Sequence, residues 1–313
     1  MAHKRLIIDT DMGVDDAHAL LMALTHPEVE VLGITTVMGN VGLPQVVQNV
    51  GHVLDLLQMD IPFYRGALYP LIGEPIPPSG LMGMDGLGDA TIGMPAPSHQ
   101  PQLEAAALAL VRMVKEAASM GDFTLVALGP LTNLALALHL MPDFAASVPH
   151  LVIMGGAYKA MGNASWTAEF NFFADPEAAR VVLEAGFADV WLLPWEVSVE
   201  QMILWPDYDE LIAMPGERAA FFECISRVSA GVLRDQFRWS GMPCPDQLAM
   251  AIALDPQAVA ADVMDVRTAV EVEGKWGRGM LAIDWNRIDG SPNAHLVTRV
   301  HQDVALKMMR AGL

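Results

Sequence analysis

Four aspartates lie within eight residues near the start of the chain, at Asp9, Asp11, Asp15 and Asp16. The apolar run Leu6-Ile7-Ile8 precedes them and an Ala- and Leu-rich run follows, so they lie between a predicted buried strand and a predicted helix. No Lys or Arg occurs between Arg5 and Arg65. Carboxylates this close repel one another unless a cation lies among them, and Ca²⁺ and Mg²⁺ prefer oxygen ligands. The spacing therefore indicates a site for a metal or another charged ligand.

The ordinary alternative for such residues is helix capping. An aspartate at a helix start often only caps the helix, which would account for Asp15 or Asp16. It does not account for Asp9 and Asp11 on the strand side of the turn. Gly13 lies between strand and helix, and we expect it to permit a sharp turn there.

Composition limits the class of protein. The chain has 313 residues, of which 53% are hydrophobic and 18% charged, so it can bury a sizeable core. A formal net charge of −19 argues against nucleic acid or an anionic membrane as partner. Two cysteines, Cys224 and Cys244, make no disulfide framework, and the first predicted strand leaves no room for a signal peptide. With no apolar stretch long enough to span a bilayer, we expect a cytoplasmic protein.

Predicted strands alternate with predicted helices along the chain. Further strands are expected at 29–37, 61–64, 123–128, 151–154 and 190–193, and helices at 44–57, 103–118, 131–140 and 176–185. This alternation predicts an α/β fold with a mostly parallel, twisted sheet and helices on both faces. Segments 266–272 and 279–285 could form an antiparallel pair at the sheet edge. The long irregular segment 66–101 is typical of segments that are functional or mobile. Without a linker or repeat, residues 1–313 are assigned to one domain.

Polar residues follow several of the predicted strands or begin a helix. They are Asn40, Thr132-Asn133, Asn163, Glu169-Phe170-Asn171 and Asp246. In an open parallel sheet, ligands bind outside the carboxyl ends of the strands, where the aspartates also lie. Taken singly, each of these residues is better explained as a turn, cap or surface residue.

Taken together, these motifs follow one another in the order seen in a known protein family. The motif Asp9-Thr10-Asp11-x-Gly13-x-Asp15-Asp16-Ala17 resembles the N-terminal signature of nucleoside hydrolases of the inosine-uridine preferring type. The resemblance continues in order over most of the chain, through the segments 34–40, 127–133, 154–156, 162–163, 168–171 and 174–179. It implies the nucleoside hydrolase fold, which is Rossmann-like, and hydrolysis of the N-glycosidic bond of ribonucleosides to ribose and free base. It also implies a bound Ca²⁺ and no organic cofactor. We further expect a homodimer or homotetramer that acts on small-molecule nucleosides.

The resemblance assigns roles by position. The carboxylates of Asp11, Asp16 and Asp246 and the backbone carbonyl of Leu128 match the Ca²⁺ ligands, and Asp11 matches the general base. The residues that match the ribose-binding set are Asp15, Asn163, Glu169 and Asn171. Asn40 matches a residue beside the metal and the attacking water, and Asp9 a supporting acid. Met154 and Trp239 complete the expected substrate contacts.

The chain departs from the family pattern mainly at positions that would contact the leaving nucleobase. Met12 replaces the usual proline, Met82 stands where a histidine is common, and Pro245 occupies the place of the histidine that serves as acid to the leaving base. None of the nine histidines falls in a site motif. Stacking on Trp166 or Trp239 could replace the acid, as could a proton from Cys244 or from segment 82–99. We expect purine nucleosides to be favoured, because purine N7 offers a second protonation route.

Two other classes of function remain open at this point. Asp9-x-Asp11 after an apolar strand also fits the nucleophile motif of haloacid-dehalogenase-type phosphohydrolases, although Asp15 and Asp16 then have no role. A nucleoside- or ribose-binding protein that has lost turnover with the histidine is the third hypothesis. Phosphatase activity with Mg²⁺ would favour the second hypothesis, and tight binding without product would favour the third.

Overall fold

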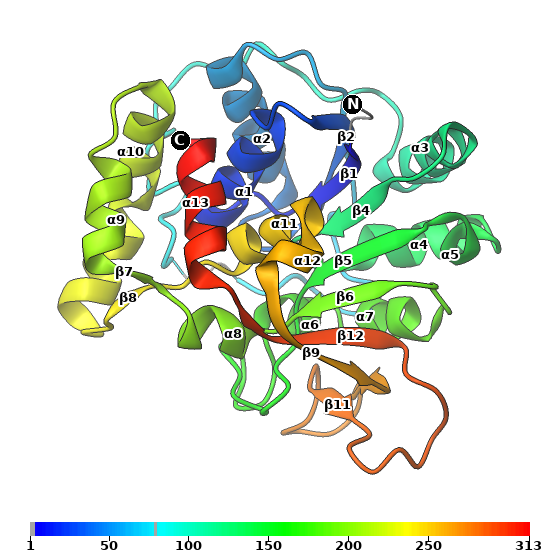
Figure 1. The fold of residues 1–313 in the computed structure, drawn as a ribbon. Helices are drawn as coiled ribbons and strands as arrows, with labels where there is room; N and C mark the ends of the chain where they lie inside the picture. Colours follow the sequence, from blue (N-terminus) through cyan, green and yellow to red (C-terminus); the bar gives the residue numbers. More distant parts are fainter. Residues whose placement is uncertain (1–3, 78–79) are drawn as a thin grey trace.

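Eight strands form the central sheet of the computed structural model, which describes residues 4–77 and 80–313. Their order is β3-β2-β1-β4-β5-β6-β12-β9, and every neighbouring pair is parallel except β12 and β9 (Figure 1). The bounds are β1 (Lys4–Thr10), β2 (Val29–Thr36), β3 (Phe63–Arg65), β4 (Thr124–Ala127), β5 (His150–Met154), β6 (Val190–Leu193), β12 (Ala294–Val300) and β9 (Ala260–Val266). The expected mostly parallel sheet is confirmed.

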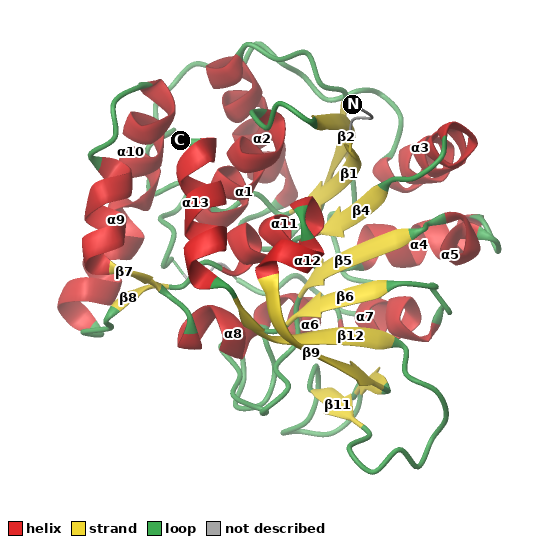
Figure 2. Ribbon diagram, in the orientation of Figure 1, coloured by secondary structure: helices red, strands yellow, loops and turns green. Residues whose placement is uncertain are grey.

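Helices cover both faces of this sheet (Figure 2). One apolar layer includes α1 (Val14–Leu24), α2 (Leu43–Leu57), α11 (Pro245–Leu254) and α13 (Gln302–Gly312). The other includes α3 (Ala106–Met120), α4 (Thr132–Leu140), α5 (Phe144–Ser147) and α7 (Pro176–Glu184). In β1, Leu6 and Ile8 pack into the first layer and Ile7 into the second. A strand covered on both faces is apolar at successive positions, which explains the run before the aspartates.

Further helices and one small strand pair complete the fold. They are α6 (Phe170–Ala174), α8 (Trp195–Glu200), β7 (Ile203–Leu204), α9 (Trp205–Ile212), α10 (Glu217–Gly231), the π-helical turn η1 (Val232–Gln236), β8 (Gly241–Met242) and α12 (Pro256–Val259). β7 and β8 form a small antiparallel pair. Among the described residues, no helix is both long and apolar enough to cross a membrane.

The predicted antiparallel pair exists but lies elsewhere. β10 (Thr268–Val270) and β11 (Leu281–Ile283) pair antiparallel in a separate two-stranded sheet, whereas β9 occupies the edge of the main sheet. The prediction of an edge position was therefore wrong. The Asn293 side chain accepts from Thr268 N at 2.7 Å and donates to Thr268 O at 2.9 Å. These two hydrogen bonds occupy the backbone N–H and C=O of Thr268, which would otherwise pair with a strand of the main sheet. The chain accordingly leaves that sheet after Val266.

Candidate active site

A cavity of about 680 Å³ opens at the carboxyl ends of β1, β4 and β5. Nine of the residues expected at the site line it: Asp11, Asp15, Asn40, Leu128, Met154, Asn163, Glu169, Asn171 and Asp246. Trp239 lines it as well. Asp16 lies beside it, with a fully buried carboxylate. The structure thus brings together residues from the beginning, middle and end of the chain.

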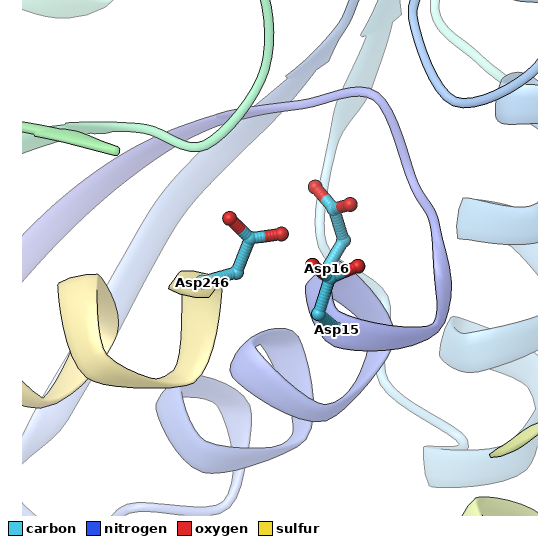
Figure 3. Close-up of side chains that lie close together, drawn as sticks. All are labelled: Asp15, Asp16 and Asp246. Carbon is cyan, nitrogen blue, oxygen red and sulfur yellow. The ribbon is translucent and has the colours of Figure 1, made fainter. Parts of the chain in front are cut away.

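The carboxylates converge from two helix starts (Figure 3). Asp15 and Asp16 occupy the first turn of α1, Asp246 the first turn of α11, and each offers an oxygen within 4.8 Å of the others. α1 and α11 pack side by side, which produces this meeting. The closest set differs from the expected one by a residue, because it contains Asp15 and not Asp11. Three buried carboxylates at this separation can bind a metal ion.

Hydrogen bonds hold Asp16 and Asp11 in place. Asp16 accepts from Thr10 Oγ1 at 2.5 Å and from the Gly13 backbone N–H at 2.8 Å. Asp11 Oδ2 accepts from the backbone N–H of Asn40 at 2.7 Å, and the Asn40 side chain donates to Asp16 at 3.2 Å. The loop after β2 therefore orients two acids that belong to β1 and α1.

The turn between β1 and α1 differs from its prediction. The left-handed residue is Met12, with a φ of 48°, and not Gly13, whose φ of −85° any residue adopts. Gly13 is needed for space, because a Cβ there would lie 2.6 Å from both Asn40 Nδ2 and Met82 Sδ. Proline cannot adopt a positive φ, so it would not fit the conformation of Met12.

Burial makes these carboxylates reluctant to ionise. It raises the pKa of Asp11 and of Asp246 well above the usual range, and neighbouring carboxylates raise both further. Burial and Asp16 raise the pKa of Asp15 to about 7. Asp11 Oδ1 and Asp15 Oδ1 are buried without a hydrogen-bond partner among the described residues. Unpartnered carboxylate oxygens, with no cation among the groups that act on them, are the donor set that a hard cation prefers.

The opposite wall joins the ends of β4 and β5. Asn171 Nδ2 donates to Leu128 O at 2.6 Å and to Met154 O at 3.2 Å. The Glu169 carboxylate accepts from the backbone N–H groups of Gly156, Asn171 and Phe172, and burial still raises its pKa to about 7. Asn163 lies on an exposed loop at the cavity rim.

The remaining wall is almost wholly apolar. It consists of Gly80, Leu81, Met82, Phe170, Trp195, Val232, Leu233, Phe237, Trp239, Pro243 and Pro245, together with Gly162 from the rim. Trp195 and Phe237 were not expected from the sequence. Trp195 begins a helix just after β6, so the carboxyl-end rule that identified Asn40 could also have found it. Phe237 follows a π-helical turn, which has no comparable sequence signal.

A comparison with known proteins decides the family. The family model described as inosine-uridine preferring nucleoside hydrolase matches residues 6–307. The chain belongs to this family. The resemblance inferred from the sequence motifs is confirmed, and with it a hydrolase acting on N-glycosyl bonds.

Relatives of this nucleoside hydrolase differ in the base they are named for. The pyrimidine-specific ribonucleoside hydrolase RihA of Salmonella typhimurium is 33% identical over 94% of this chain and 93% of its own length. Uridine nucleosidase 1 of Arabidopsis thaliana is 40% identical over 67% of this chain, which spans only 61% of that plant protein. A solved inosine-guanosine nucleoside hydrolase superposes with a TM-score of 0.91 at 36% identity, covering 99% of this chain and 98% of its own. The fold prediction is thereby confirmed.

No described histidine lines the cavity of this nucleoside hydrolase. His18 is buried between α1 and α13, where Nε2 lies 3.0 Å from Met309 O. His99 is bonded to Asp55 at 2.5 Å, and His150 and His295 both contact Asp189. His3 lies outside the described residues. Within the described part of the chain, the cavity therefore has no imidazole to protonate a leaving base.

Two other groups that were expected to assist the leaving base also lie outside the cavity. Cys244 is buried, lies outside the lining, and burial raises the pKa of its thiol to about 12. Trp166, proposed as a stacking residue, is 75% exposed and stacks on Trp276 instead. It does not line the cavity. Of the groups expected to assist the leaving base, those that line the cavity are Trp239 and Met82 of segment 82–99.

Asp9 cannot serve as an open nucleophile. It is fully buried, does not line the cavity, and accepts from Thr35 Oγ1 at 2.5 Å and Asn133 Nδ2 at 2.7 Å. The haloacid-dehalogenase-type hypothesis requires an exposed aspartate at this position, and it is wrong for this chain. As expected for a supporting acid, Asp9 links β1 to β2 and α4.

Proposed function

We propose that this protein is a Ca²⁺-dependent ribonucleoside hydrolase that cleaves the N-glycosidic bond to give ribose and free base, with purine nucleosides favoured. The observation that carries the proposal is the cavity itself. Its lining combines buried carboxylates that have unpartnered oxygens with a large set of apolar and aromatic side chains. This combination suits a molecule that joins a polyhydroxylated sugar to a flat heterocycle.

In this proposal, Asp11, Asp16, Asp246 and the Leu128 carbonyl would hold the Ca²⁺, and Asp15 would bind the sugar. Asp16 and Asp246 belong to the closest carboxylate set, while Asp11 and Leu128 line the same cavity. The Leu128 carbonyl already accepts from Asn171, and its second lone pair leaves room for a ligand. A bound Ca²⁺ would orient a water and ease its deprotonation.

Asp11 is the proposed general base. Its Oδ2 is held by Asn40, which leaves Oδ1 to take the proton of a water at the anomeric carbon. The transition state of glycoside cleavage carries positive charge on the sugar, and the surrounding carboxylates stabilise that charge. Asn163, Glu169, Asn171 and Asp15 are proposed to bind the ribose hydroxyls.

The proposed preference for purines rests on the apolar wall. Without a histidine in the described lining, a pyrimidine lacks the imidazole that would protonate it. A purine can be protonated at N7 and then stabilised by an aromatic face. Trp195, Phe237 and Trp239 provide three such rings. The relative named for inosine and guanosine is 36% identical over nearly the whole chain, which agrees with this preference.

Ribose release from inosine, guanosine, adenosine, uridine and cytidine, each with and without chelator, tests the proposal. The expected result is release that needs added Ca²⁺ and is greater for purines. Chelator-resistant release would overturn the Ca²⁺ requirement, and faster release from uridine would overturn the purine preference. Tight nucleoside binding without any ribose would instead support the binding-protein hypothesis.

The proposal also covers the oligomeric state and the cellular location of the protein. We propose a single-domain subunit in a homodimer or homotetramer, acting in purine salvage in the cytoplasm. Both cysteines are free, as is usual in a reducing compartment. Light scattering on the purified protein measures the mass of the assembly, and a monomer would contradict this part.

A further inference from the structure

The loop between β5 and α6 carries Asn163 to the rim of the cavity, and the β10–β11 hairpin lies beside it, green and orange in Figure 1. Asn163 occupies a tight turn in which the Gly162 N–H donates to Trp166 O at 3.2 Å. A Cβ on Gly162 would lie 2.3 Å from Ser165 O and 2.4 Å from Ala168 O. The turn therefore has little freedom, and the hydrogen bond of its backbone to Trp166 couples Asn163 to that residue.

Trp166 is held from outside the loop. Its ring stacks on Trp276 of the hairpin, with centroids 4.3 Å apart and planes at 23°. Next to it, Thr167 Oγ1 donates to the backbone carbonyl of Trp276 at 2.6 Å. The two tryptophans are 75% and 54% exposed, so they are not core residues. The stack joins two segments that are distant in sequence.

The hairpin that presents Trp276 is itself anchored. Arg278 donates to both oxygens of Glu177 on α7, at 2.7 and 2.9 Å, and to Val272 O at 2.6 Å. Gly279 fits closely, because a Cβ there would lie 2.9 Å from Phe173 Cα. A bidentate arginine pair fixes orientation as well as distance. Trp276 therefore belongs to a hairpin that is anchored to α6 and α7.

The inner end of the loop has its own support. Buried Glu196 of α8 accepts from the backbone N–H groups of Tyr158 and Lys159, at 3.1 and 2.7 Å. The loop is thus held at its beginning by Glu196 and at its end by Trp276. Asn163 lies between these two supports.

We propose that Trp276 is a positioning residue for substrate binding, acting through Trp166 and Thr167 to hold Asn163 at the rim of the cavity. The inference rests on the proposed function, since the ligand of Asn163 is the ribose of a nucleoside. Trp276 does not line the cavity and touches no reacting atom. Its loss widens the range of positions that Asn163 occupies, which weakens ribose binding and leaves the chemical step unchanged.

The test compares Trp276→Ala, Trp276→Phe and the matched control Trp285→Ala by steady-state kinetics with inosine. Trp285 is also 54% exposed, and it makes no ring contact among the described residues. We expect Trp276→Ala to raise KM roughly two- to tenfold, the change that matches loss of one aromatic stack, with kcat unchanged. Trp276→Phe should restore KM, and Trp285→Ala should have no effect. An unchanged KM in Trp276→Ala, or an equal rise in Trp285→Ala, overturns the inference.

Trypsin cleavage after Lys159, in the same loop, gives a readout that needs no catalysis. Trp276→Ala should be cut there faster than the wild type, because its loop is less restrained. A wild type that releases no ribose would contradict the proposed function alone. In that case, faster cleavage of Trp276→Ala would still support the restraint on the loop, and equal cleavage would overturn it.

Discussion

The backbone N–H of Asn40 donates to Asp11 Oδ2 at 2.7 Å, which fixes a carboxylate at the end of one strand from the loop after its neighbour. The other oxygen of Asp11 is buried and has no partner in the described part of the chain. One half of this carboxylate is therefore oriented and the other half is available. Both residues line the cavity, and in the proposed mechanism the available oxygen is the one that accepts a proton from water.

The first prediction follows from that arrangement. Asp11→Asn should abolish ribose release, by about 10²-fold or more, because an amide cannot take up a proton from water. The side chain keeps its size, so the melting temperature should change little. Since metal affinity should also fall, the measurement is made at saturating Ca²⁺. Asp289→Asn, in an exposed loop, is the control. Activity within a few-fold of wild type would remove Asp11 from the base role.

Removal of metal should lower both stability and activity. Asp15, Asp16 and Asp246 face one another, and burial raises the pKa of Asp15 and of Asp246. A cation that binds only the native state stabilises it by mass action. The melting temperature should therefore fall after chelation and recover when Ca²⁺ is returned, in parallel with ribose release. The metal assignment fails if chelation changes neither quantity.

His18 should make the fold sensitive to acid. Burial lowers its pKa from an ordinary 6.5 to about 4. Between pH 4 and pH 6.5 the unfolded chain binds a proton at His18 that the folded chain excludes. The contribution of neutral His18 to the free energy of unfolding is therefore complete above pH 6.5 and is lost as pH falls toward 4. His18→Gln keeps a donor for Met309 O and cannot titrate, so it should remove up to about 3 kcal/mol of this loss.

Urea unfolding of wild type and His18→Gln at several pH values measures the difference. The carboxylates of the site are the same in both proteins, so their contribution cancels in the comparison. Parallel pH curves for the two proteins would contradict the assignment to His18.

Trp239 should matter more for purines than for ribose. Its backbone is held at both sides, since Trp239 N–H donates to Leu233 O at 3.0 Å and Trp205 Nε1–H donates to Trp239 O at 2.7 Å. Trp239→Ala should lower kcat/KM for inosine by about tenfold and leave inhibition by free ribose almost unchanged. Equal cleavage of uridine and inosine, with Trp239→Ala silent, would decide against stacking on this ring.

Local sequence determined strands β1 to β6, helices α1, α2, α3, α4 and α7, and the acidic turn of this protein. It did not reveal β9 and β12 of the main sheet, nor the helices α9, α10 and α13. The run Leu6-Ile7-Ile8 is apolar at every position because a central parallel strand is buried on both faces, and that pattern needs no partner to be recognised. The aspartates that follow it could be assigned to a charged-ligand site because their repulsion is a local property. Family motifs extended this to Asn40, Glu169, Asn171 and Asp246, which the structure places around one cavity.

Tertiary structure alone decided which distant segments meet. Asp246 joins Asp15 and Asp16 because α11 packs beside α1, and Trp276 reaches Trp166 because the chain leaves the main sheet after Val266 to form the β10–β11 hairpin. The positive φ of Met12 and the aromatic wall at Trp195 and Phe237 depend on the same packing. Periodicity reports which face of an element is buried, but not which element buries it. Contacts between elements far apart in sequence therefore became visible only in the folded chain.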